Sequence, residues 1–88
     1  MDIFITPHPE VVAAPVGDEI VLLHAETGVY YSLNAVAARL WVLWQGGASV
    51  ASACASVAEE CGVSSSQVEA DAAALIEALD AQGLIRRR

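Results

Sequence analysis

The sequence predicts an α+β domain in which three short antiparallel strands precede three α-helices. Two observations support this fold class. Residues 28–34 alternate between the two faces of an extended chain and end at Asn34, whose short side chain can cap the start of a helix. After Asn34 the apolar residues recur at the helical spacing of about 3.6 residues instead of at every second residue. This change of period separates a strand-forming part from a helix-forming part.

The strand-forming part begins with residues 1–15, where three prolines exclude a helix. They leave room for a short extended piece around residues 10–14, which we expect to be the first strand or a flexible arm. Residues 19–25 are rich in β-forming side chains and follow a turn at Gly17, as a second strand would. Because the connection to residues 28–34 is short, the second and third strands should form a hairpin, with the third strand at a sheet edge.

Each of the three predicted helices opens at a capping residue and closes at glycine. The expected caps are Asn34, Ser49 and one of the serines at 64–66, and the expected stops are Gly46-Gly47, Gly62 and Gly83. The third helix should turn one apolar stripe towards the core, formed by Val68, Ala72, Leu75, Ile76 and Leu79. Leu84 and Ile85 should pack against the core, and residues 86–88 should fray into solvent. We therefore expect one domain of winged-helix type over residues 16–85.

Composition and charge narrow the possible partners. The 88-residue chain is long enough for one domain, and its formal net charge is −7 with a sequence pI near 4.4. It has four Lys and Arg residues in all, and three of them are its last three residues. A nucleic-acid partner is not expected, because neutralising phosphates requires a basic face. No apolar run reaches the roughly 20 residues that span a bilayer, and the N-terminus lacks a signal-peptide pattern, so we expect a cytoplasmic protein without a membrane partner.

Residues suited to catalysis or metal binding are scarce. His8 lies in the proline-rich start and His24 ends a predicted strand, and neither has a cysteine or histidine at a spacing typical of metal sites. Cys54 and Cys61 lie about 10 Å apart by helical rise, which is too far for a disulfide. We expect both to be small buried apolar residues. The sequence predicts no enzyme activity, no metal and no cofactor.

Several short motifs, in their order along the chain, carry a resemblance to a known family. They are Gly28 to Asn34, Ala37 to Trp41, Gly46 to Val50, Val68 with Asp71, and Leu79 to Ile85. Together they make residues 16–85 resemble the PqqD-like family, whose modules are precursor-peptide recognition elements for ribosomally made, modified peptides (RiPPs). True PqqD proteins usually carry Pro-Glu ahead of the strand and Cys-Asp-Gly after the first helix. Because this chain has His24-Ala25 and Gln45-Gly46-Gly47 there, it looks more like the stand-alone recognition protein of lasso-peptide pathways.

The resemblance implies both a partner and a site. The protein would bind the leader segment of a ribosomally made precursor peptide and deliver it to a leader peptidase or another modifying enzyme. In the family the leader lies antiparallel along the third strand, in a groove walled by the third helix. The positions implicated here are Val29, Tyr30, Tyr31, Ser32, Leu33, Val68, Asp71, Ala72, Leu75 and Ile76.

Elementary chemistry adds detail to this site. An edge strand offers unpaired N–H and C=O groups, which an extended peptide can satisfy by adding a strand. Alternation predicts that Tyr31 packs its ring on the core and that Tyr30 faces outwards as a contact. The small side chains of Ala72 and Ala78 would leave depressions beside Leu75 that an aromatic or proline side chain of the leader could fill. Asp71 could pair with a leader cation or N–H group, or it could be a solvated first-turn acid favoured by the helix dipole.

Two other functions fit the same fold. A winged-helix DNA-binding regulator would need cations on its third helix, but residues 63–83 contain four acids and no Lys or Arg, so we prefer a peptide partner. A structural subunit could instead dock its sheet edge permanently on a partner enzyme or on its own copy. We expect a monomer that binds the leader, whereas a dimer insensitive to the leader would support the structural role.

Overall fold

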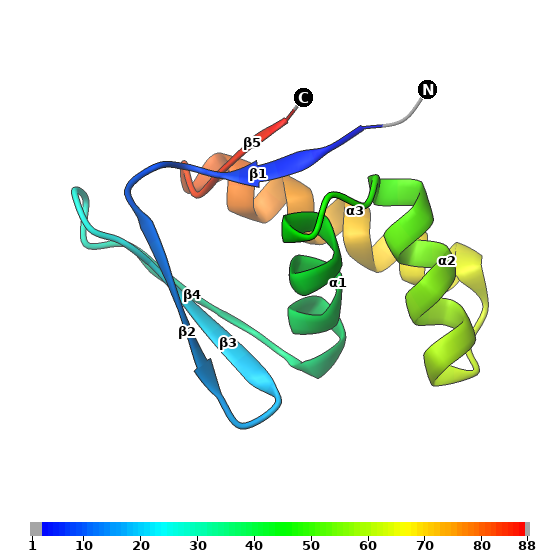
Figure 1. The fold of residues 1–88 in the computed structure, drawn as a ribbon. Helices are drawn as coiled ribbons and strands as arrows, with labels where there is room; N and C mark the ends of the chain where they lie inside the picture. The colour runs from blue at the N-terminus through cyan, green and yellow to red at the C-terminus, as the bar shows by residue number, and fades with distance from the viewer. Residues whose placement is uncertain (1–2, 88) are drawn as a thin grey trace.

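The structure is a computed structural model, which describes residues 3–87. Within these residues the elements follow in the order β1 (Ile5–Pro7), β2 (Val11–Val16), β3 (Glu19–His24), β4 (Tyr30–Leu33), α1 (Ala35–Gln45), α2 (Val50–Cys61), α3 (Ser65–Ala81) and β5 (Ile85–Arg87) (Figure 1). Strands β2 to β4 form one layer, and the helices lie on one side of it with α1 against the sheet. This α+β arrangement confirms the predicted fold class.

The three-stranded sheet has the order β2-β3-β4, and both neighbouring pairs are antiparallel. Leu22 of β3 lies between Ala13 of β2 and Tyr31 of β4, which defines the register. Gly17 makes the tight turn between β2 and β3, where its φ of 64° is a conformation that residues with a Cβ rarely adopt. The predicted meander is therefore present, with a first strand that extends beyond the expected residues.

Side-chain caps open all three helices at predicted residues. Asn34 Oδ1 accepts the N–H of Ala37 at 2.9 Å, so α1 begins directly after β4. Ser49 and Ser64 cap α2 and α3 in the same way, with oxygen–nitrogen distances of 3.1 and 3.3 Å. Gly62 ends α2 in the left-handed conformation, as predicted. Within the part of the chain that the structure describes, no helix is both long and apolar enough to cross a membrane.

A second, two-stranded sheet joins the two ends of the chain. β1 pairs antiparallel with β5, with Ile5 opposite Arg87 and Thr6 opposite Arg86. The expectation that the C-terminal residues fray is wrong for Arg86 and Arg87, and residue 88 lies outside the described residues. The physical reason is that the chain reverses after α3 and brings Ile85, which is buried together with Ile5, back beside the N-terminal strand.

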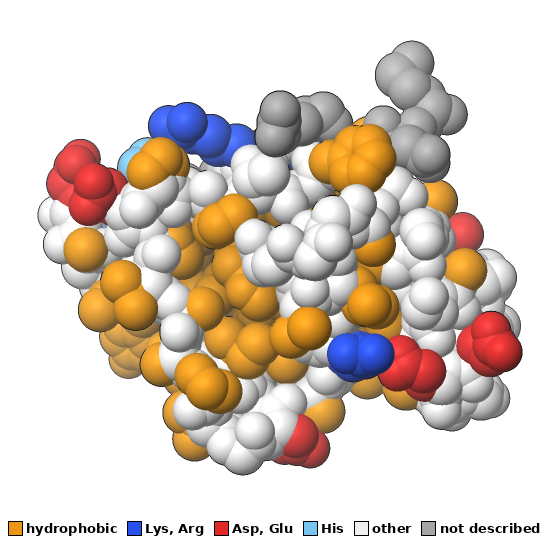
Figure 2. Space-filling view, viewed as in Figure 1, with side chains coloured by type: hydrophobic (Ala, Val, Ile, Leu, Met, Phe, Trp, Pro, Cys, Tyr) orange, Lys and Arg blue, Asp and Glu red, His pale blue; other side chains and the backbone are white. Residues whose placement is uncertain are grey.

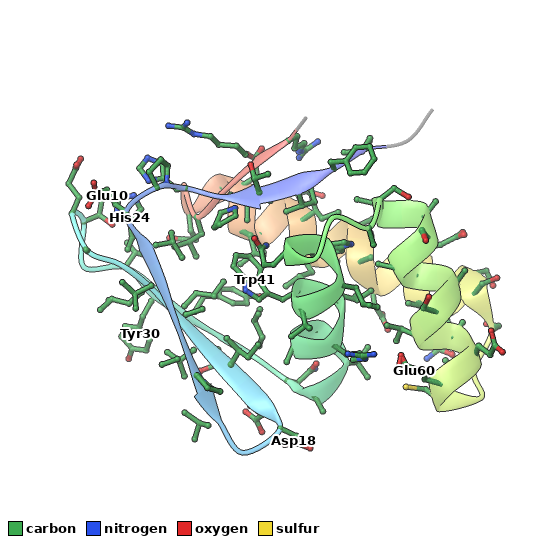
Figure 3. All side chains as sticks on the ribbon, viewed as in Figure 1. Glu10, Asp18, His24, Tyr30, Trp41 and Glu60 are labelled. Carbon is green, nitrogen blue, oxygen red and sulfur yellow. The ribbon has the colours of Figure 1, made fainter. Side chains whose placement is uncertain are left out.

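The core lies between the inner face of the three-stranded sheet and the helices. Its largest fully buried side chains include Leu22, Leu33, Leu40 and Leu79, and Trp41 lies between the sheet and α1 (Figure 3). Tyr31 packs against this core, whereas Tyr30 is 71% exposed and points away from the helices (Figure 3). The predicted division between the two tyrosines is confirmed.

Candidate functional site

Strand β4 forms one edge of the three-stranded sheet. It pairs with β3 on one side, and within residues 3–87 no strand pairs with its other side. An edge of this kind carries backbone groups that the sheet itself leaves unpaired. The predicted edge position of this strand is therefore confirmed.

The hydrogen bonds to β3 show which backbone groups of β4 point to the open edge. The N–H of His24 donates to the carbonyl oxygen of Val29 at 2.8 Å, just before β4 begins. In an antiparallel pair, hydrogen-bonded and non-bonded residue pairs alternate along the strands. Counting on from Val29, the backbone groups of Tyr31 and Leu33 are therefore hydrogen-bonded to β3. The N–H and C=O groups of Tyr30 and Ser32 consequently point outwards, where a further strand would pair.

The turn before β4 is held by a buried histidine. His24 is 4% exposed, and its Nδ1 accepts the N–H groups of Glu26 and Thr27 at 3.2 and 3.3 Å. The carbonyl oxygen of His24 also accepts the N–H of Gly28 at 2.8 Å. These bonds close the β3–β4 hairpin and set where β4 starts.

A groove of about 390 Å³ runs beside β4, between that strand, α1 and α3. It lies next to the inner-face side chain of Tyr31 and the outward backbone of Ser32. Apolar groups dominate among the lining side chains, and Asp71 is the charged residue in that set. The lining residues are Tyr31, Ser32, Asn34, Val36, Ala37, Leu40, Asp71, Ala74 and Leu75. An extended chain added to β4 would therefore lie along this groove.

The structure brings some of the expected site residues to the groove and leaves others out. Tyr31, Ser32, Asp71 and Leu75 line it, and Val29 and Tyr30 lie along the same hairpin. Leu33, Val68 and Ala72 are buried in the core, because the helical and strand stripes that include them pack against each other. Ile76 lines a different pocket on the other flank of α3. The depression beside Leu75 thus lies at Ala74, and the expected Ala72 and Ala78 do not line the groove.

Several groove residues were not expected. Ala74 carries a recognisable signal, since it lies three residues after Asp71 and therefore on the same face of α3. Val36, Ala37 and Leu40 come from α1, which crosses between β4 and α3. No local pattern predicts that crossing, because it depends on how the helices pack in three dimensions. Asn34, which follows β4 and caps α1, also lines the groove.

The position of Asp71 settles one of the two interpretations of this residue. α3 begins at Ser65, and no acidic residue lies in its first turn. The interpretation of Asp71 as a first-turn acid is therefore wrong, because the favourable effect of the helix dipole is confined to that turn. Asp71 is exposed at the mouth of the groove, where its carboxylate can accept a hydrogen bond or pair with a cation.

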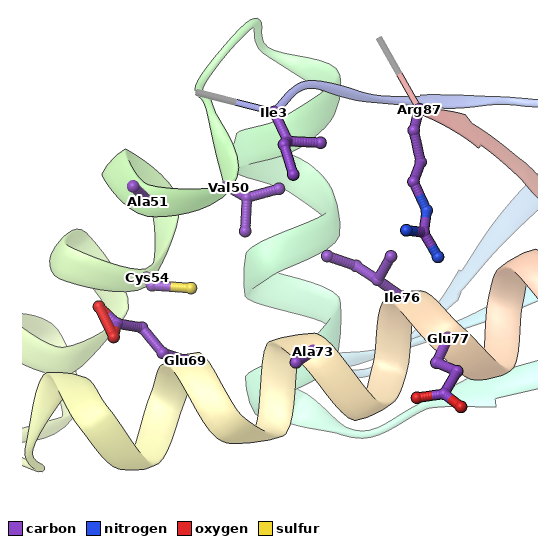
Figure 4. Close-up of a pocket in the computed structure, with 9 residues that line it drawn as sticks. All are labelled: Ile3, Val50, Ala51, Cys54, Glu69, Ala73, Ile76, Glu77 and Arg87. Carbon is purple, nitrogen blue, oxygen red and sulfur yellow. The ribbon is translucent and has the colours of Figure 1, made fainter. Parts of the chain in front are cut away.

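A larger pocket of about 640 Å³ lies on the opposite flank of α3, against α2 (Figure 4). Cys54 and Ile76 form part of its apolar wall, and Glu69 and Glu77 lie at its sides. Burial, together with the charge of Glu69, raises the pKa of the Cys54 thiol above its ordinary value of 9.0. Both cysteines are free. Cys54 is buried as expected, but the expectation is wrong for Cys61, which is exposed on the last turn of α2.

Comparisons with known proteins agree with this geometry. The family described as "Coenzyme PQQ synthesis protein D (PqqD)" matches residues 19–85. The solved structure of TbiB1 in complex with the TbiA(beta) leader peptide is 33% identical, with a TM-score of 0.85 over 92% of this chain and 94% of that chain. A lasso peptide synthetase B1 complexed with the leader peptide is 29% identical, with a TM-score of 0.85 over 93% and 96%. No curated protein matches the chain.

Proposed function

The chain belongs to the PqqD family, and we propose that it binds the leader segment of a ribosomally synthesised precursor peptide and delivers it to the leader peptidase of a lasso-peptide pathway. The single observation that carries this proposal is the open edge of β4 with a groove beside it. The two similar solved structures support the choice of ligand, because both are complexes with leader peptides.

Backbone pairing supplies the first part of the proposed binding. The leader adds an antiparallel strand to β4 and satisfies the outward N–H and C=O groups of Tyr30 and Ser32. These bonds do not depend on the leader's side chains, so they contribute affinity with little selectivity. The short Ser32 side chain lets a second backbone approach the edge closely.

Selectivity comes from the groove. Tyr31, Ala74 and Leu75 form an apolar surface that an aromatic or proline side chain of the leader fills. Asp71 at the mouth of the groove accepts a hydrogen bond from a leader N–H or pairs with a leader Lys or Arg. This role requires binding and presentation alone, and the protein performs no chemical step on the peptide in this proposal.

Amide hydrogen exchange followed by NMR tests the strand addition. The probe is a synthetic leader peptide of the cognate precursor, and a labelled copy first gives the affinity by fluorescence anisotropy. At saturation, exchange of the Tyr30 and Ser32 N–H groups should slow, whereas Tyr31 and Leu33, which already bond to β3, should change little. Absence of any binding would contradict leader recognition. Binding without protection of Tyr30 and Ser32 would contradict strand addition and leave recognition standing.

A further inference from the structure

The three-stranded sheet has a second edge, formed by β2, and within the part of the chain that the structure describes no strand pairs with its outer side. The N–H of Ala25 donates to the carbonyl oxygen of Glu10 at 2.8 Å, so Glu10 bonds in the direction of β3 just before β2 begins. Bonded and non-bonded pairs alternate from there along the two antiparallel strands. The backbone groups of Val11, Ala13 and Pro15 therefore point away from β3, towards the open side of β2.

Few hydrogen-bond donors remain on this open side of β2. The N–H of Val11 donates to the carbonyl oxygen of His8 at 2.9 Å and so closes the turn before the strand. Pro15 has no backbone N–H at all. Of the three outward positions, only Ala13 keeps an N–H that has no backbone partner among the described residues. On β4, by contrast, both outward positions keep their N–H groups.

Neither the neighbouring turn nor the core accounts for Pro15. Gly17 makes the turn to β3 with its positive φ, and Pro15 is exposed. Pro7 in β1 has an equivalent position. The N–H of His8 donates to the carbonyl oxygen of Leu84 at 3.0 Å, so the nitrogen of the preceding Pro7 faces away from β5. Both prolines that lie in strands thus face an unpaired side, where a missing N–H breaks no bond of the sheet.

Apart from its missing donors, the β2 edge resembles the β4 edge. A hollow of about 310 Å³ lies beside it, between the β2–β3 hairpin and α1. Pro15, Ile20 and Val42 contribute apolar side chains to its lining, and Figure 2 shows hydrophobic side chains gathered between the strands and α1. An extended chain beside β2 would therefore also find an apolar surface. Backbone pairing by itself does not distinguish the two edges, because it does not depend on side chains.

We propose that Pro15 is a specificity-determining residue that confines strand addition to β4. This inference rests on the proposed function, because it concerns the edge to which the leader adds its strand. A strand added to β2 would find one free donor, that of Ala13, so some of its carbonyl groups would lose water without gaining a partner. The leader is thereby directed to the edge that has Asp71 and the groove beside α3. One protein then binds one leader.

The same residue keeps leader-free copies from pairing with one another through β2. If both edges accepted strands, β4 of one copy could add to β2 of the next, and such head-to-tail pairing continues without closing. Proline on an edge strand is a known protection against this association. The blocked edge of β2 thus removes a competitor for the edge of β4 that the leader uses.

Replacement of Pro15 by valine tests the proposal, since it restores an outward N–H and removes no bond to β3. The probe is the synthetic leader peptide of the cognate precursor, titrated by isothermal calorimetry. The unmodified protein should bind one leader. Pro15→Val should bind a second one, at least about tenfold more tightly than any second binding to the unmodified protein, and the amide of Ala13 should then be protected from hydrogen exchange. The affinity of the first leader should not change, because β2 lies two strands from the open edge of β4.

A proline placed two residues earlier provides the matched control. Ala13→Pro in the Pro15→Val background removes the other outward donor, so the double variant should again bind one leader. A purely structural effect of losing Pro15 would not be reversed in this way. Pro15→Ala restores the same N–H with a smaller side chain, and it keeps the test decisive if circular dichroism shows that Pro15→Val does not fold.

Each outcome supports or overturns the inference. A second leader on Pro15→Val or Pro15→Ala, with protection of Ala13 and loss of the second binding in the double variant, supports it. Self-association of either variant without leader, seen by sedimentation and accompanied by protection of Ala13, supports it as well.

A folded variant that binds one leader and stays monomeric overturns the inference, and its normal first binding shows that the proposed function stands. A second leader that also binds the unmodified protein or the double variant equally well overturns it too, because the outward donors of β2 would not then decide the binding. If the unmodified protein binds no leader, the proposed function and the inference fail together.

Discussion

The groove assignment makes a sharp prediction for two adjacent alanines of α3. Ala74 and Ala73 are both exposed, but Ala74 lines the groove beside β4 and Ala73 lines the pocket against α2. Ala74→Glu should weaken leader binding, whereas Ala73→Glu should not. Leu75 is a poorer choice, because it is only 9% exposed and a charge there would disturb the core.

The expected magnitude follows from the surroundings of Ala74. A glutamate there would lose water when the leader fills the groove, and it would lie three residues from Asp71 on the same helix face. Burying a polar group without a partner costs about 1–3 kcal/mol, which corresponds to about a 5- to 150-fold loss of affinity. The Ala73→Glu variant controls for repulsion between acidic side chains on α3, because Ala73 lies four residues from both Glu69 and Glu77.

Fluorescence anisotropy with a labelled leader measures both variants, and circular dichroism confirms that they fold. A folded Ala74→Glu protein with the affinity of the unmodified chain would remove the groove from the binding site. Equal losses in the two variants would also refute the reasoning, because the effect would then come from the added charge on α3 and not from the groove.

Three further predictions follow from single contacts. Ser32→Pro removes an outward N–H from β4 but no bond to β3, so it should weaken leader binding about fivefold or more while Ser32→Ala should not, as measured by anisotropy. Asn34→Ala deletes the cap of α1 and should cost about 1 kcal/mol, a fall in Tm of about 4–8 °C that Asn34→Asp should largely avoid. Because burial raises the pKa of the Cys54 thiol above 9.0, the folded state keeps its proton at pH values where the unfolded state loses it. Stability should therefore fall as the pH rises from about 9 towards the raised pKa, and urea unfolding of Cys54→Ala should show a smaller fall over that range.

The sequence predicts well what local chemistry decides. Asn34, Ser49 and Ser64 each cap a helix through their own side chain; residue type and spacing predict the first two by position and narrow the third to one of the serines at 64–66. The alternation of β4 correctly separates the buried side of Tyr31 from the exposed side of Tyr30. These features need no knowledge of the rest of the fold, because each depends on residues only a few positions apart.

Contacts between segments that are far apart in the chain are harder to predict from the sequence. The pairing of β1 with β5 joins Ile5 to Arg87, and neither three-residue strand carries a pattern that identifies its partner. The residues that line the groove are hard to predict for the same reason. An apolar stripe on α3 identifies a buried face, yet it does not tell Val68, which is buried in the core, from Leu75, which borders the groove. Each residue of an α-helix is turned by about 100° from the one before it. Ile76, which follows Leu75, therefore lines the pocket on the opposite flank of α3.

The four residues of β4 have three different tasks, and the register of the strand keeps them apart. Tyr31 and Leu33 face the core and bond to β3, while Tyr30 and Ser32 point their backbone groups to the open edge and their side chains to the face of the sheet away from the helices. A slip of one residue would exchange every task, placing Ser32 in the core and turning the bonded N–H groups outwards. Leu33 is fully buried, so such a slip would also expose a large apolar side chain. The core packing that stabilises the domain therefore also holds the edge in the register that the proposed strand addition requires.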